Sequence, residues 1–121
     1  MIERDWAERF AREWIEGWNS HDLERIFSHY VEDFEMSSPF IVERMNEPSG
    51  VLRGKAAIRP YWSWGLQLQP PLKFELLSVY AGVDKIAIHY RSVGRWLVVE
   101  VLTLNAARQV THGAALYGDP C

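Results

Sequence analysis

Large apolar side chains recur at a helical spacing near the start of the chain. Trp6, Phe10, Trp14 and Trp18 follow one another every four residues, and charged Glu and Arg residues lie between them. This spacing puts four aromatic rings on one face and predicts an amphipathic helix over residues 4–18. Such a face is either ordinary core or one wall of a cavity, and the pattern alone leaves both open.

Two further helices are predicted from the same kind of pattern. One follows Ser20, which is a suitable N-cap, and the other spans residues 54–66, where Pro60 should bend it. The first has apolar residues at i, i+3, i+4 and i+7, namely Leu23, Ile26, Phe27 and Tyr30. The second turns Ala57, Ile58, Tyr61 and Trp62 inward.

Alternating and β-branched segments predict five strands. The first lies within residues 34–41 and is ended by Pro39, because proline cannot donate a ladder hydrogen bond. Residues 42–53 show no period and are predicted to form a loop, either a lid or a passive surface segment. The remaining strands are predicted at residues 72–81, 85–93, 95–104 and 110–117. A connection of hairpin length joins each of these four strands to the next.

The predicted strand 95–104 carries an unusual acid. Alternation places Trp96, Val98, Glu100, Leu102 and Leu104 on one face, and Leu97, Val99, Val101 and Thr103 on the other. Neither row resembles a solvent face, so the carboxyl group of Glu100 is expected among apolar neighbours. An unpaired charge in such a place is costly, and the group either becomes neutral or finds a partner.

The element order predicts the architecture. Two helices, a strand, a helix and then four strands in a meander indicate an α+β cone: three N-terminal helices packed in the concave face of a curved, mainly antiparallel β-sheet. A length of 121 residues fits a single domain spanning 1–121.

Composition and charge exclude several classes of function. Hydrophobic content of 48% with six Trp suits a globular domain, and a formal charge of −3 without a basic stripe argues against a nucleic-acid partner. The charged start and the lack of a long apolar run predict no signal peptide and no membrane span, hence a cytoplasmic location. Cys121, the last residue, cannot form an internal disulfide. No glycine-rich phosphate loop and no Cys/His cluster is present, so neither cofactor nor metal is expected.

Several short motifs make the chain resemble the nuclear transport factor 2-like superfamily, in its SnoaL-like and ketosteroid isomerase-like branch. They are Trp18-Asn19-Ser20-His21-Asp22-Leu23, Tyr30-Val31-Glu32-Asp33, Gly54-Lys55-Ala56-Ala57-Ile58-Arg59 and Ala115-Leu116-Tyr117-Gly118. The likeness covers about residues 4–118 and implies the cone-shaped fold. It implies no one reaction, because this fold hosts many activities.

The motifs of known enzymes of this fold match the chain only in part. The hydrogen-bonding acid of ketosteroid isomerases falls on Glu100, but their general-base Asp falls on Ser38 and their oxyanion-hole Tyr on Trp14, so that activity is not expected. The Asp-Arg-Asp set of epoxide hydrolases is missing from inward strand positions. The paired inward histidines of scytalone dehydratases are missing too, because His89 and His112 are predicted to face outward.

The resemblance also implies a deep apolar pocket for a small apolar molecule. Its predicted ligand-binding residues are Trp14, Trp18, Phe34, Met36, Ser38, Phe40, Tyr61, Trp62, Tyr90, Trp96 and Tyr117. In this pocket Glu100 should have a raised pKa and act as an acid/base, as SnoaL-like cyclases are thought to use a single carboxylate. Tyr90, Tyr117 or the Trp14 N–H would then stabilise a developing enolate.

Three other interpretations stay open. Glu100 pairs with Arg91, Arg95 or Arg108 and does no chemistry, the pocket belongs to a non-catalytic binding module, or aromatic side chains fill the pocket and the domain only dimerises. Relatives commonly pair through the convex side of the sheet. A homodimer is therefore expected through the mixed patch of Leu97, Val99, Val101 and Thr103 with Ala87, His89 and Arg91.

Overall fold

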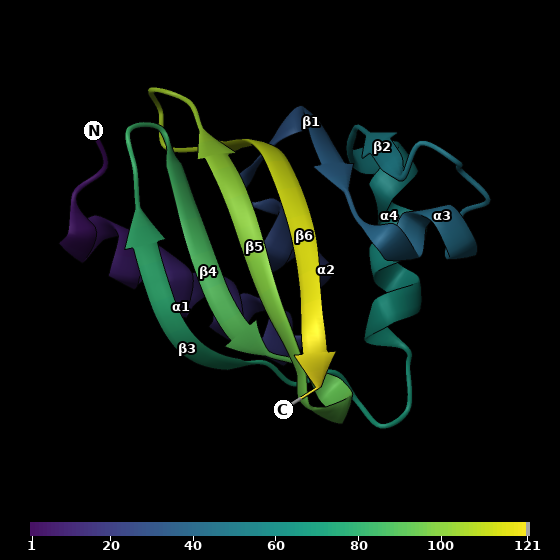
Figure 1. The fold of residues 1–121 in the computed structure, drawn as a ribbon. Coiled ribbons are helices and arrows are strands. Elements are labelled where there is room, and N and C mark those ends of the chain that lie inside the picture. Colours follow the sequence, from purple (N-terminus) through teal and green to yellow (C-terminus); the bar gives the residue numbers. More distant parts are fainter. Residues whose placement is uncertain (121) are drawn as a thin grey trace.

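A computed structural model describes residues 1–120, and the expectation for Cys121 lies outside this range. Figure 1 shows a curved six-stranded sheet with helices behind it. The strands are β1 (Tyr30–Ser37), β2 (Val51–Arg53), β3 (Glu75–Ala81), β4 (Lys85–Arg91), β5 (Trp96–Leu104) and β6 (Val110–Pro120). The helices are α1 (Arg4–Ser20), α2 (Leu23–Phe27), α3 (Pro39–Arg44) and α4 (Lys55–Leu66), with a 3₁₀ turn, η1, at Val93–Arg95.

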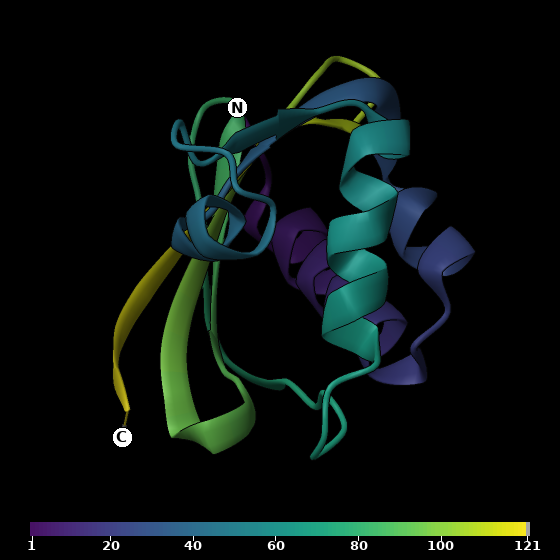
Figure 2. The ribbon, with the colours of Figure 1, turned by 90° about the vertical axis from the view of Figure 1, so that its right-hand side faces the viewer.

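The sheet has the order β2-β1-β6-β5-β4-β3. The last four strands form the predicted meander, and β1 pairs parallel with β6. Figure 2, a view along the sheet, shows α1, α2 and α4 on one side of it. The α+β fold with helices packed on a curved, mainly antiparallel sheet is therefore confirmed. No helix within residues 1–120 combines the length and the apolar character that a bilayer crossing needs.

The alternation predicted for β5 is present. Val98, Glu100, Leu102 and Leu104 are buried under the helices, whereas Leu97, Val99, Val101 and Thr103 are half-buried on the other face. Trp96 begins the inward row but is 41% exposed, because it lies at the open end of the layer. The inward row of β5 thus carries Glu100 into the space between sheet and helices.

The second helix differs from its prediction. His21, in the left-handed conformation, ends α1 after Ser20, and Asp22 is the actual N-cap of α2 because its side chain accepts from the Arg25 N–H. Helix α2 ends at Phe27, and Tyr30 is the first residue of β1, where it pairs with Val110 of β6. Pairing with a strand eighty residues away decided the conformation of Tyr30.

The segment after β1 also differs from its prediction. Strand β1 ends at Ser37, and Ser38 and Pro39 begin the short helix α3, so Phe40 lies on a helix and not on a strand. Ser38 accepts a hydrogen bond from the Phe40 N–H, and proline suits the first helical position. Strand β2 lies within the predicted loop 42–53, and α4 continues through Pro60.

Candidate functional site

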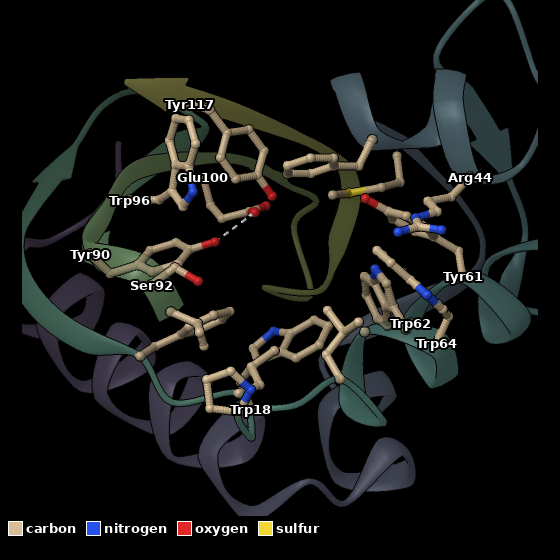
Figure 3. Close-up of a pocket in the computed structure, with 18 of the residues that line it drawn as sticks. Trp18, Arg44, Tyr61, Trp62, Trp64, Tyr90, Ser92, Trp96, Glu100 and Tyr117 are labelled. Atoms are coloured by element: carbon tan, nitrogen blue, oxygen red, sulfur yellow. Dashed lines mark hydrogen bonds between the residues drawn. The ribbon is translucent and has the colours of Figure 1, made fainter. Parts of the chain in front are cut away.

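A cavity of about 350 Å³ lies between the inward face of the sheet and helices α1 and α4 (Figure 3). Helix α3, the 67–72 connection and η1 form the rest of its wall. It is lined by Trp14, Trp18, Met36, Phe40, Arg44, Tyr61, Trp62, Trp64, Gly65, Leu68, Gln69, Pro70, Leu72, Phe74, Tyr90, Ser92, Val93, Trp96, Glu100 and Tyr117. Its size and aromatic lining are typical of small-molecule sites.

Glu100 lies in this wall with its carboxyl group out of water. Strand register places it between Ile88 of β4 and Ala115 of β6, and it is 5% exposed. The Tyr90 hydroxyl donates to Glu100 Oε1 at 3.1 Å (Figure 3). Burial raises the pKa of Glu100 from its ordinary 4.5 to about 7, against the opposing effect of the Tyr90 hydrogen bond. At neutral pH both protonation states are therefore populated.

The charge of this carboxyl group acts on four tyrosine hydroxyls of the described chain. Burial raises the pKa of Tyr30, Tyr61, Tyr90 and Tyr117, and the nearby charge of Glu100 raises it further. All four phenols therefore stay protonated at neutral pH and act as hydrogen-bond donors. Of these, Tyr90 and Tyr117 lie beside Glu100 on the same side of the cavity, which is therefore its more polar side (Figure 3).

Two of the donors predicted to stabilise an enolate are already engaged. Trp14 Nε1 donates to the Tyr30 hydroxyl at 2.9 Å, and the Tyr90 hydroxyl donates to Glu100. The Tyr61 hydroxyl donates to Ser38 Oγ at 3.2 Å. Tyr117 is the remaining predicted donor, and it lines the cavity beside Glu100 (Figure 3).

Most of the residues predicted for the pocket come together in the structure. Ten of the twelve, Glu100 included, line the cavity, whereas Phe34 and Ser38 do not. Phe34 is fully buried in the core beside the rings of Tyr30 and Trp62, with ring centroids 4.4 and 5.5 Å away. Ser38 is buried behind the cavity wall as the cap of α3.

Sequence reasoning missed several residues of the cavity wall and the contact between Tyr30 and Trp14. Trp64 lies three residues after Tyr61 on α4, and their rings stack 6.1 Å apart, so the i, i+3 spacing was a usable signal. Arg44 and the 67–72 connection carried no such signal, because neither segment has a period. Tyr30 was assigned to a helix, and its contact with Trp14 follows only from the strand pairing.

The arginine partners proposed for Glu100 are largely engaged elsewhere. Arg91 pairs with Glu75 at 2.7 Å and Arg108 with Glu3 at 2.9 Å. The histidines predicted to face outward do so: His89 hydrogen-bonds to Ser78, and His112 is exposed beside Thr111. Within the described chain, no cluster of three or more His, Cys, Asp or Glu side chains could hold a metal ion.

Comparison with known proteins gives one family and one fold. The model of the SnoaL-like domain matches residues 11–117. A SnoaL-like protein of unknown function from Burkholderia thailandensis is 47% identical, with a TM-score of 0.94 and 98% of each chain covered. Among curated proteins, no sequence matches.

Two more distant structures share the fold at under 20% identity. The epoxide hydrolase/cyclase-like enzyme SalBIII, described for pyran ring formation in the polyether salinomycin, is 18% identical with a TM-score of 0.75, covering 98% of this chain and 95% of its own. AclR, a putative hydroxylase from Streptomyces galilaeus, is 19% identical with a TM-score of 0.73, covering 98% and 83%. At this identity each likeness concerns the fold alone.

Proposed function

This chain belongs to the family of SnoaL-like domains, and we propose that it is an acid–base enzyme of the isomerase or cyclase type. Its substrate is a small, largely apolar molecule that carries a carbonyl group. Glu100 moves a proton at the carbon next to that carbonyl, inside the aromatic cavity. Neither a metal nor an organic cofactor has a role in this reaction.

The environment of Glu100 carries the proposal. The carboxyl group is buried in the wall of a cavity and has a pKa of about 7. Within residues 1–120 it accepts one side-chain hydrogen bond, from the Tyr90 hydroxyl. A general base works best when its pKa is close to the working pH, because the base form is then present and still accepts protons readily. Structural carboxylates are usually paired with a cation and have a low pKa, which is the opposite situation.

The chemistry needs one base and one hydrogen-bond donor. The Glu100 carboxylate takes the proton from the carbon, and the C–H electron pair moves into the carbon–carbon bond as the carbonyl electrons move to oxygen. The Tyr117 hydroxyl donates to the resulting enolate oxygen. Protonated Glu100 then returns the proton to a carbon of the enolate system, which leaves the enzyme unchanged.

A non-catalytic binding module is the second candidate. The aromatic rings of the cavity favour an apolar ligand whether or not a reaction follows, and the Tyr90 hydrogen bond partly satisfies Glu100. In that case Glu100 recognises a hydroxyl or amine group of the ligand. The two candidates differ in what happens when the carboxyl group loses its ability to accept a proton.

Proton exchange at carbon separates the two candidates without knowledge of the natural substrate. In D₂O, wild-type protein should accelerate deuterium uptake next to the carbonyl of 2-tetralone, as followed by ¹H NMR. The rate should rise through pH 7 and level off above it, because the carboxylate form of Glu100 is the base. Glu100→Gln should lower the rate to that of buffer while 2-tetralone still binds, as measured by calorimetry.

Glu32→Gln is the matched control, because Glu32 is exposed on β1 and lies outside the cavity. It should exchange deuterium at the wild-type rate. Exchange by Glu100→Gln at the wild-type rate would exclude Glu100 as the base. Binding of 2-tetralone by wild-type protein without any exchange would favour the binding module.

A further inference from the structure

Arg44 occupies an unusual position at the cavity. It is the last residue of α3, it is exposed, and it forms part of the cavity wall. Its guanidinium carbon lies 4.3 Å from the ring centroid of Trp64, which lines the same cavity. Figure 3 shows Arg44 with Tyr61 and Trp64 on one side of the cavity and Glu100 with Tyr90 on the other. The two charged groups of the cavity therefore lie on separate walls.

The charge of Arg44 is not matched by a protein carboxylate. Of the described residues that line the cavity, Arg44 is the one cation and Glu100 the one acid. No carboxylate within residues 1–120 forms an ion pair with Arg44, whereas Arg53 pairs with Glu35 and Arg59 with Glu24. Arg44 thus brings an unneutralised positive charge to the opening of an otherwise apolar cavity.

Stacking on Trp64 holds this guanidinium in an orientation in which it can bind an anion. A guanidinium that lies on an indole face is held by a cation–π contact, and its planar edge keeps its N–H donors available. These donors match the two oxygens of a carboxylate, and a charge-assisted bidentate contact is among the stronger hydrogen-bonding arrangements. The geometry therefore offers an oriented anion site at the cavity mouth.

We propose that the ligand of this cavity is an amphipathic acid: an apolar, aromatic-sized body fills the cavity, and an anionic oxygen group such as a carboxylate binds Arg44 at the mouth. This inference rests on the proposed function only in assigning a ligand to the same cavity. The acid group and the carbonyl group then occupy opposite ends of the ligand. Repulsion by the Glu100 carboxylate prevents the reversed orientation, because it would bring two negative charges together.

Two probes that share a naphthalene ring system isolate the effect of the ligand's negative charge on binding. The carboxylate 2-naphthoate and the neutral alcohol 2-naphthalenemethanol have nearly the same shape, and their dissociation constants can be measured by calorimetry at pH 7 and low salt. Wild-type protein should bind the naphthoate roughly tenfold more tightly than the alcohol, as one charge-assisted contact predicts. Arg44→Gln should remove this preference and bind the alcohol as the wild type does, which also shows that the cavity is intact.

Arg59→Gln is the matched control. Arg59 also stacks on a ring, 5.0 Å from the centroid of Phe27, but it is paired with Glu24 and lies outside the cavity. This variant should keep the wild-type preference, and Arg44→Lys should keep part of it because the charge remains. The inference is overturned if wild-type protein does not bind the naphthoate or does not prefer it. It is equally overturned if Arg44→Gln changes the dissociation constant of neither probe, or weakens the binding of both probes by the same factor.

The test is independent of turnover. Loss of deuterium exchange in Glu100→Gln with an unchanged naphthoate affinity in Arg44→Gln would leave the acid–base function standing and remove the anion site. A naphthoate preference that depends on Arg44, without any exchange by wild-type protein, would leave the anion site standing and remove the proposed reaction.

Discussion

At position 100 the chain holds a carboxyl group whose nearest neighbours on the same face of the strand are Val98 and Leu102, both buried. The folded state therefore favours the neutral acid, and the charged form is stabilised by the Tyr90 hydroxyl and little else in its wall. Burial of this carboxyl group costs stability at neutral pH, and under the proposed function it supplies a base of suitable strength. Such a compromise between stability and reactivity is common at functional sites.

The pH dependence of stability should report this compromise. Below pH 4.5 the carboxyl group is protonated in the folded and the unfolded chain, whereas between 4.5 and about 7 only the folded chain keeps the proton. The free energy of unfolding therefore falls as pH rises through this range, by about 3 kcal/mol in total. Glu100→Gln lacks this loss, so its stability relative to wild type should rise between pH 5 and pH 8.

Urea unfolding at pH 5 and pH 8 measures the effect, with Glu32→Gln as the exposed control that should follow the wild type at both pH values. If the difference between Glu100→Gln and wild type is the same at the two pH values, the raised pKa of Glu100 is wrong.

Among the elements, the short helix α3 contributes two residues to the cavity wall. It spans Pro39–Arg44, and its two cavity residues, Phe40 and Arg44, are four positions apart and so share one face. The Phe40 ring packs edge-on against Tyr117, with centroids 4.8 Å apart. The strand within residues 34–41 and the loop 42–53 that the sequence alone suggested would have placed Phe40 and Arg44 differently. The start of the helix after Ser38 therefore shapes the cavity wall.

Removal of the helix cap should weaken this element. Ser38→Ala loses the acceptor for the Phe40 N–H and leaves the buried Tyr61 hydroxyl without its partner. The expected loss is about 1–3 kcal/mol in the free energy of unfolding, measured by chemical denaturation. Ser63→Ala, at a half-buried position of α4, is the control and should be neutral or slightly stabilising. Equal stability of Ser38→Ala and wild type would show that the cap does not hold α3 in place.

On the scale of the whole molecule, the two faces of the sheet differ in what covers them. The helices cover one face, whereas the other carries Val99 and Leu116 side by side on β5 and β6, with Leu116 51% exposed. Tyr80 on β3 adds a second large side chain to this face and is 58% exposed. We propose that a second copy of the chain covers this convex face, because the half-buried apolar row of β5 continues into exposed neighbours there.

Light scattering after size-exclusion chromatography should give a dimer for wild-type protein at micromolar concentration. Leu116→Glu should shift it to a monomer, because two copies would bring the new charges together at an apolar interface. Val83→Glu, in the β3–β4 hairpin at a position that is 73% exposed, should stay dimeric. A monomeric wild type, or a Leu116→Glu dimer of unchanged stability, would contradict the proposal.

The sequence by itself determined what depends on repetition along one element. The four-residue period of α1, the strand meander and the alternation that buries Glu100 are local patterns, and burial on one face of a helix or strand follows from its own period. Half of the twenty residues that line the cavity could be named in advance for this reason, because nearly all of these ten lie on the inward faces of regular elements.

Only the tertiary structure decided where the irregular and non-local parts lie. Tyr30 joined β1 through hydrogen bonds with β6, and it then took the Trp14 N–H that would otherwise face the cavity. Arg44 reached the cavity mouth because α3 turns the chain back, and Trp64 then fixed its direction. Contacts between segments far apart in the sequence leave no period in either segment, so they become visible only when the chain is folded.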